Sequence, residues 1–148
     1  MRPWPIRLLM SLALAVVLAA SLAGPAAALD GQVLPGRWYG EKFYERVHQD
    51  MRWITERRAN GTFITEVRVY DGCRQTGGYV FTGTWSFDGH IYTSRIRDDG
   101  DDNADRIATY EITQLSDRTM AYVHRESGLR YTAEKVGPGF RFPACATS

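Results

Sequence analysis

Residues 79–93 read Tyr-Val-Phe-Thr-Gly-Thr-Trp-Ser-Phe-Asp-Gly-His-Ile-Tyr-Thr. From Tyr79 to Phe87 every second position but one is aromatic, which is the two-residue period of a strand with one buried face. Asp88-Gly89 follows, a residue pair typical of a two-residue hairpin turn because both positions tolerate positive φ. The stretch therefore predicts a β-hairpin, with strands at residues 79–87 and 90–96.

The same alternation continues on both sides of this hairpin. We predict six further strands, at residues 36–43, 51–58, 62–70, 106–113, 119–125 and 129–136. No segment between residues 29 and 148 shows helical periodicity over three turns, although residues 41–49 could hold one short turn. Eight strands in series predict an all-β fold, an eight-stranded antiparallel up-and-down β-barrel. Such a barrel is either filled by its own side chains or holds one small ligand.

The predicted connections alternate between short and long. The turns near Asn60, Asp88 and Ser116 are short and lie at one end of the barrel, the tight end. The opposite, loose end carries the two longest predicted connections, residues 71–78 and 98–105. Binding residues concentrate on loops held by a rigid scaffold. We therefore expect a ligand to reach any pocket at the loose end, between these two loops.

Gly36-Arg37-Trp38 opens the first strand at the tight end, ahead of the eight-strand meander. This arrangement resembles the lipocalin (calycin) superfamily, and especially its short bacterial lipocalin-like domains, from Gly36 to about Cys145. The resemblance implies that Trp38 plugs the tight end and that Arg130 is a possible counterpart of the family's arginine that packs on this tryptophan. It also implies a disulfide that ties the C-terminal tail to the barrel wall.

The chain begins with the layout of a secretory signal peptide. Arg2 and Arg7 give a positive start, residues 8–23 are apolar, and residues 26–28 are three alanines. We expect cleavage after residue 28, with an uncleaved membrane anchor as the alternative. The predicted domains are therefore a signal peptide (1–28), an N-terminal arm (29–35) and a lipocalin-like barrel with a C-terminal tail (36–148). The expected location is periplasmic or secreted, without a stable membrane span.

The charge of the mature chain argues against polyanionic partners. The full chain has a formal net charge of +1, and removal of residues 1–28 takes away two arginines and no acid, which leaves −1. A near-neutral domain lacks the basic surface that nucleic acids and anionic membranes require. The 120 residues that remain are enough for one domain with its own core.

Two cysteines remain in the mature chain, Cys73 and Cys145. In an exported protein such a pair most often forms a disulfide, and two free thiols or a metal pair are the alternatives. The barrel topology would require residues 137–145 to run back along the outer wall, where Phe140 and Phe142 could cover it. We predict a Cys73–Cys145 disulfide.

The inward faces of the strands supply the candidate ligand-binding residues, and their aromatic side chains combine an apolar body with a hydroxyl or indole donor. They are Trp53, Phe63, Phe81, Trp85, Tyr110, Tyr122 and Tyr131. Such a lining suits a ligand with an apolar body and a few polar atoms. We expect Trp85 fluorescence to report binding. In the alternative interpretation these side chains fill the barrel and leave no cavity.

Catalytic and metal-binding patterns are weak. The acidic loop at residues 98–105 has the alternating ligands of a calcium loop but lacks the glycine and the closing glutamate that follow, so a solvated loop is the simpler interpretation. His48 and His124 would lie at the loose end, but zinc needs three or four ligands. No Gly-x-Ser-x-Gly motif or paired acid and base is present. We predict no enzyme activity, no cofactor and no metal site.

These observations together predict an exported lipocalin-like barrel that binds a small hydrophobic or amphipathic molecule without catalysis. The alternative is a periplasmic protein-binding barrel, such as a protease or lysozyme inhibitor, whose protein partner contacts the loop end or the arm at residues 29–35. An enzyme built on a calycin barrel is a third reading. An open cavity favours the first function, and a filled core with an exposed apolar patch favours the second.

Overall fold

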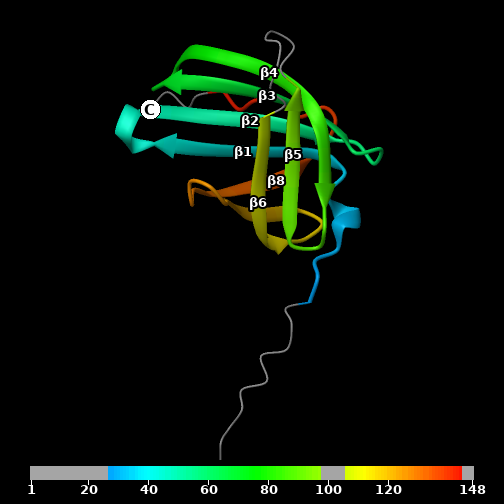
Figure 1. The fold of residues 1–148 in the computed structure, drawn as a ribbon. Coiled ribbons are helices and arrows are strands. Elements are labelled where there is room, and N and C mark those ends of the chain that lie inside the picture. Colours follow the sequence, from blue (N-terminus) through cyan, green and yellow to red (C-terminus); the bar gives the residue numbers. More distant parts are fainter. Residues whose placement is uncertain (1–26, 98–105, 145–148) are drawn as a thin grey trace, which may run out of the picture.

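The computed structural model describes residues 27–97 and 106–144 and shows a closed barrel in which each strand pairs with its neighbour in sequence (Figure 1). β8 pairs with β1, which closes the sheet. The strands are β1 (Gly36–Tyr44), β2 (Gln49–Arg57), β3 (Thr62–Asp71), β4 (Arg74–Phe87), β5 (Ile91–Arg97), β6 (Arg106–Leu115), β7 (Thr119–His124) and β8 (Arg130–Val136). Two short 3-10 helices, η1 (Gly31–Val33) and η2 (Glu45–Val47), precede and follow β1. The predicted eight-stranded antiparallel barrel is confirmed.

The prediction of a long loop at residues 71–78 is wrong. β4 begins at Arg74, so only Gly72 and Cys73 connect it to β3. Gly72 has φ 58°, a left-handed conformation that glycine adopts at little cost. A register shift between Val69 and Tyr70 accommodates an extra residue of β4, as a β-bulge does. The other long connection, residues 98–105, lies outside the described residues together with the calcium hypothesis that it prompted.

Trp38 and Leu34 close the tight end of the barrel. Their side chains are 1% and 0% exposed, and the Trp38 indole Nε1 donates a hydrogen bond of 2.9 Å to the Leu34 carbonyl. Lys135 donates to the Val33 carbonyl at 2.7 Å and lies 5.3 Å from the centre of the Trp38 ring. The expected position of Trp38 is confirmed. The cation that packs on the Trp38 ring is Lys135. The expectation that Arg130 packs on this ring is wrong, because Arg130 is the first residue of β8 and lies at the loose end.

The C-terminal tail, residues 137–144, runs along the outside of the barrel over β1 to β3. Its Phe140 ring lies 5.1 Å from the ring of Tyr39 on β1. The Arg68 guanidinium on β3 lies 4.3 Å from the Phe142 ring. The expected path of the tail along the wall, with both phenylalanines covering it, is confirmed for the described part.

The ends of the chain leave two predictions untested. Arg52 donates a hydrogen bond of 2.9 Å to the Pro143 carbonyl, so the tail heads toward the loose end, where Cys73 lies. Cys145 is outside the described residues, and the Cys73–Cys145 disulfide stays a prediction. Residues 1–26 are also outside them, so the signal peptide stays a prediction as well. Within residues 27–97 and 106–144, no helix is long and apolar enough to cross a membrane.

We expect Leu34→Ala to lower the free energy of unfolding by about 2–5 kcal/mol, because the truncation leaves a cavity under the Trp38 ring. Urea denaturation followed by circular dichroism measures the loss. Val47→Ala is the matched control, since Val47 is 58% exposed and a surface truncation should change stability by less than about 0.5 kcal/mol. Equal effects of the two substitutions would show that the arm does not seal the barrel.

Candidate functional site

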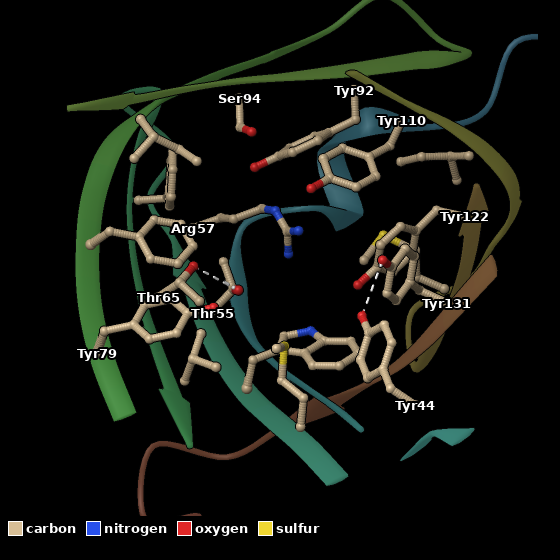
Figure 2. A pocket seen from close by; sticks show the side chains of 18 residues that line it. Tyr44, Thr55, Arg57, Thr65, Tyr79, Tyr92, Ser94, Tyr110, Tyr122 and Tyr131 are labelled. Atoms are coloured by element: carbon tan, nitrogen blue, oxygen red, sulfur yellow. Dashed lines mark hydrogen bonds between the residues drawn. The ribbon is translucent and has the colours of Figure 1, made fainter. Parts of the chain in front are cut away.

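The barrel contains a cavity of about 200 Å³, roughly the volume of seven molecules of liquid water. Its walls come from every strand of the barrel (Figure 2). Nine of the lining side chains carry a hydroxyl: Tyr44, Thr55, Thr65, Tyr79, Tyr92, Ser94, Tyr110, Tyr122 and Tyr131. The remaining lining residues, Arg57 apart, are apolar or aromatic: Met51, Trp53, Phe63, Val67, Phe81, Ile96, Ile112 and Met120. The interior is therefore incompletely filled, as the ligand-binding hypothesis requires.

Six of the seven residues predicted to bind a ligand line this cavity, namely Trp53, Phe63, Phe81, Tyr110, Tyr122 and Tyr131. Trp85 is not among the lining residues, and its placement there was wrong. It lies near the tight-end terminus of β4, where its indole Nε1 donates to the Arg58 carbonyl at 3.1 Å and its ring stacks on Tyr92 at 6.0 Å. Trp85 thus packs beneath the pocket, and Trp53 is the tryptophan that touches the cavity.

The sequence analysis missed the contribution of β5, which lines the cavity with Tyr92, Ser94 and Ile96. Both faces of β5 carry a mixture of apolar and polar residues, so alternation alone does not orient this strand. Pairing with β4 does orient it, because directly opposed residues share a face of the sheet. Ser94 lies opposite Trp85, and Trp85 belongs to the aromatic face of β4 that was expected to point inward.

A set of touching rings forms the wall on the side of β6, β7 and β8. The Tyr110 and Tyr122 rings meet edge to face at 5.5 Å, and Tyr122 stacks on Tyr131 at 5.3 Å. Trp53 contacts Tyr131 edge to face at 5.7 Å from the other side. The Tyr44 and Tyr131 hydroxyls are 3.3 Å apart. Rings that hold one another in such geometries present a preformed surface to a ligand.

Gly40 gives the Trp53 ring its place on this wall. A Cβ at Gly40 would lie 2.5 Å from Cε2 of Trp53 and 2.8 Å from the Thr132 carbonyl oxygen. Any larger residue would therefore collide with the ring and with the backbone of β8. The glycine lets the indole lie flat against β1, where it borders the cavity without filling it.

Arg57 is the only charged side chain among the described residues that line the cavity. It is 8% exposed, and its Nε and Nη1 atoms are buried without a hydrogen-bond partner. The guanidinium lies 4.7 Å from the centre of the Tyr92 ring. Figure 2 shows it projecting into the middle of the cavity, close to the Thr55–Thr65 hydroxyl pair, whose oxygens are 2.9 Å apart. Arg57 lies four residues after Trp53 and shares its face of β2, but the sequence analysis did not name it as a site residue.

Burial controls the ionisation of the tyrosines in the cavity. Desolvation raises the pKa of Tyr110 and Tyr122 above the ordinary value of 10.0, and the positive charge of Arg57 offsets part of this rise. Desolvation likewise raises the pKa of Tyr44, and its hydrogen bond with Tyr131 adds to the rise. These hydroxyls therefore stay protonated at neutral pH and can donate hydrogen bonds to a ligand.

The residues considered as metal ligands do not converge in the described part of the chain. His124 is engaged with Ser127, with Nδ1 of His124 and Oγ of Ser127 2.8 Å apart, and His48 lies in the β1–β2 connection. Within residues 27–97 and 106–144, no three His, Cys, Asp or Glu side chains cluster as a metal site would require.

The chain matches no protein-family model and no curated protein. Its fold is compatible with a lipocalin-like barrel, and the geometry of the cavity carries the functional argument.

We expect Gly40→Ala to lower the free energy of unfolding by about 1–3 kcal/mol, because the methyl group forces the Trp53 ring off the wall. The emission maximum of tryptophan should shift at the same time. Gly77→Ala in β4 is the control, since the nearest atom to its Cβ would be 3.9 Å away, on Val69. If Gly77→Ala lowered the free energy of unfolding as much as Gly40→Ala, the loss would come from replacing a glycine in a strand and not from displacing the Trp53 ring.

We expect the protein to lose stability as the pH rises above about 10, the ordinary pKa of tyrosine. The fold raises the pKa of Tyr122, so above that pH the native state binds more protons than the unfolded state, and the free energy of unfolding falls with pH. Below about pH 10, Tyr122 is protonated in both the native and the unfolded state, and its full contribution to the free energy of unfolding is present. Urea denaturation at several pH values measures the slope. Tyr122→Phe should make the slope shallower, and an unchanged slope would contradict this assignment.

Proposed function

We propose that this protein is an exported lipocalin-like binding protein, which holds a small amphipathic molecule inside its barrel and does not transform it. The single observation that carries this proposal is the cavity of about 200 Å³ with its preformed aromatic wall. Binding sites for small molecules are concave, mostly apolar, and contain a few placed polar groups. The cavity combines apolar rings with hydroxyls and one guanidinium in this way.

The size of the cavity limits the ligand. Sites for drug-sized molecules occupy about 300–1,000 Å³, and this cavity is smaller. A single aromatic ring with a short polar substituent, or a short aliphatic chain, matches its volume and its walls. Burial of such a ring contributes about 2 kcal/mol from the apolar area alone.

The route into the cavity is at the loose end of the barrel. Leu34 and Trp38 seal the opposite end. The lining extends to the loose end, where Tyr44 ends β1. Tyr79, which also lines the cavity, is 50% exposed. The proposed route lies at the end of the barrel that the sequence analysis predicted. The predicted entry between two long loops is not kept, because a tight turn joins β3 and β4.

A protein-binding barrel remains the second candidate function. Phe43 and Val47, at the connection between β1 and β2, are 54% and 58% exposed and lie at the loose end. The arm at residues 29–35 supports this candidate less than expected, because Leu34 is fully buried in the barrel. A protein partner would therefore contact the loose end.

We expect wild-type protein to bind at least one small aromatic compound from a panel of benzoate, phenylacetate, phenylacetamide and benzyl alcohol, measured by calorimetry and by thermal stabilisation. Ser94→Met fills the cavity, because Ser94 lines it and is buried, and should abolish binding. Thr93→Met on the outer face of β5 is the matched control and should bind as wild type does. If none of the compounds bound the wild type, the proposed function would be wrong.

A further inference from the structure

The guanidinium of Arg57 has no counter-charge in the described part of the cavity. No Asp or Glu is among the lining residues. The described ion pairs of the protein involve Arg52, Arg58, Arg68 and Arg74, and none involves Arg57. Its ring contact with Tyr92 covers one face of the guanidinium, but the N–H groups at Nε and Nη1 lie in its plane and have no protein acceptor.

A buried arginine cannot relieve this situation by becoming neutral, because the guanidinium group keeps its positive charge in proteins. Burial of an unpaired charge opposes folding, and an apolar residue of similar size at the same place would often be neutral or stabilising. The charge is tolerable when a ligand supplies the acceptors. Stability alone therefore does not explain Arg57, whereas recognition of an anion does.

We propose that the ligand is a small carboxylate whose anionic head pairs with Arg57 while its apolar body rests on the aromatic wall. The Arg57 side chain lines the cavity and projects into it (Figure 2), and its planar guanidinium can hold the two oxygens of a carboxylate through Nη2 together with either Nε or Nη1. Tyr92 and Tyr110, whose hydroxyls Figure 2 shows on the same side of the cavity as the guanidinium, add neutral donors. This inference rests on the proposed function, because it names the ligand class of the same cavity.

A carboxylate fits the site better than a phosphate ester. One guanidinium carries one positive charge, and a carboxylate carries one negative charge, so the pair is neutral. A phosphate monoester carries a charge of about −1.5 to −2 at neutral pH, which would leave excess negative charge in the cavity. The tyrosines cannot neutralise that excess, since their hydroxyls are uncharged at this pH.

The test compares ligands that differ only in charge. Phenylacetate and phenylacetamide have the same apolar body and nearly the same shape, and benzoate and benzamide form a second pair. We expect calorimetry to show that wild-type protein binds each carboxylate about tenfold to a hundredfold more tightly than its amide, the range expected for hydrogen bonds to a charged group. Phenyl phosphate should bind more weakly than benzoate.

Arg57→Met removes the charge and keeps much of the side-chain volume. We expect it to fold, to bind phenylacetamide about as well as the wild type does, and to lose the preference for phenylacetate. Arg57→Lys keeps the charge but not the planar fork, and should keep only part of the preference. Arg58→Met is the control, because the Arg58 side chain is 61% exposed and points away from the cavity, and should keep the full preference.

The outcomes separate this inference from the proposed function. If the amides and carboxylates bound the wild type equally, the carboxylate assignment would be wrong while the binding function stood. Tighter binding of phenyl phosphate than of benzoate would also overturn it, in favour of a phosphate ester. If none of these compounds bound, both the function and the inference would fall. The comparison of ligands on the wild type decides the matter even if Arg57→Met does not fold.

Discussion

The pairing of β1 with β8 is the interaction on which the interior of this protein depends. It joins Arg37, Trp38 and Tyr39 to the end of β8 and turns an open sheet into a closed barrel. A closed eight-stranded barrel has an interior just wide enough for side chains or one small ligand. The Trp38 side chain, on the same stretch of β1, plugs the tight end, and Lys135 on β8 packs against it. Closure and plugging therefore come from the same few residues.

The choice of side chains then decides how much of the interior stays open. Tyrosine and tryptophan rings lie against the wall and against one another, and Gly40 provides the space that the Trp53 ring needs. A core of branched aliphatic residues would meet in the centre of the barrel, whereas these flat rings leave a cavity there. The guanidinium of Arg57 projects into this cavity, where a buried unpaired charge is unfavourable in the absence of an anion. The unpaired charge of Arg57 and the unfilled part of the interior thus lie in the same cavity.

The sequence predicted the barrel well because alternation and hairpin turns are local signals. It correctly placed six of the seven proposed ligand-binding residues on the cavity wall. It failed at Gly72, where a tight turn and a bulge replace an expected loop, because the Gly77-Gly78 pair interrupts the alternation of β4. It could not show that Arg57 lacks a partner, since that property depends on all the strands that surround the guanidinium.

A crystal structure of the protein soaked with para-bromobenzoate tests the central claim most directly, because the anomalous scattering of bromine locates the ligand independently of the protein. We expect one bromine peak inside the barrel, with the carboxylate paired to Arg57 and the ring against Tyr122 and Tyr131. A barrel without such a peak, or bromine found solely on the outer surface, would contradict the account.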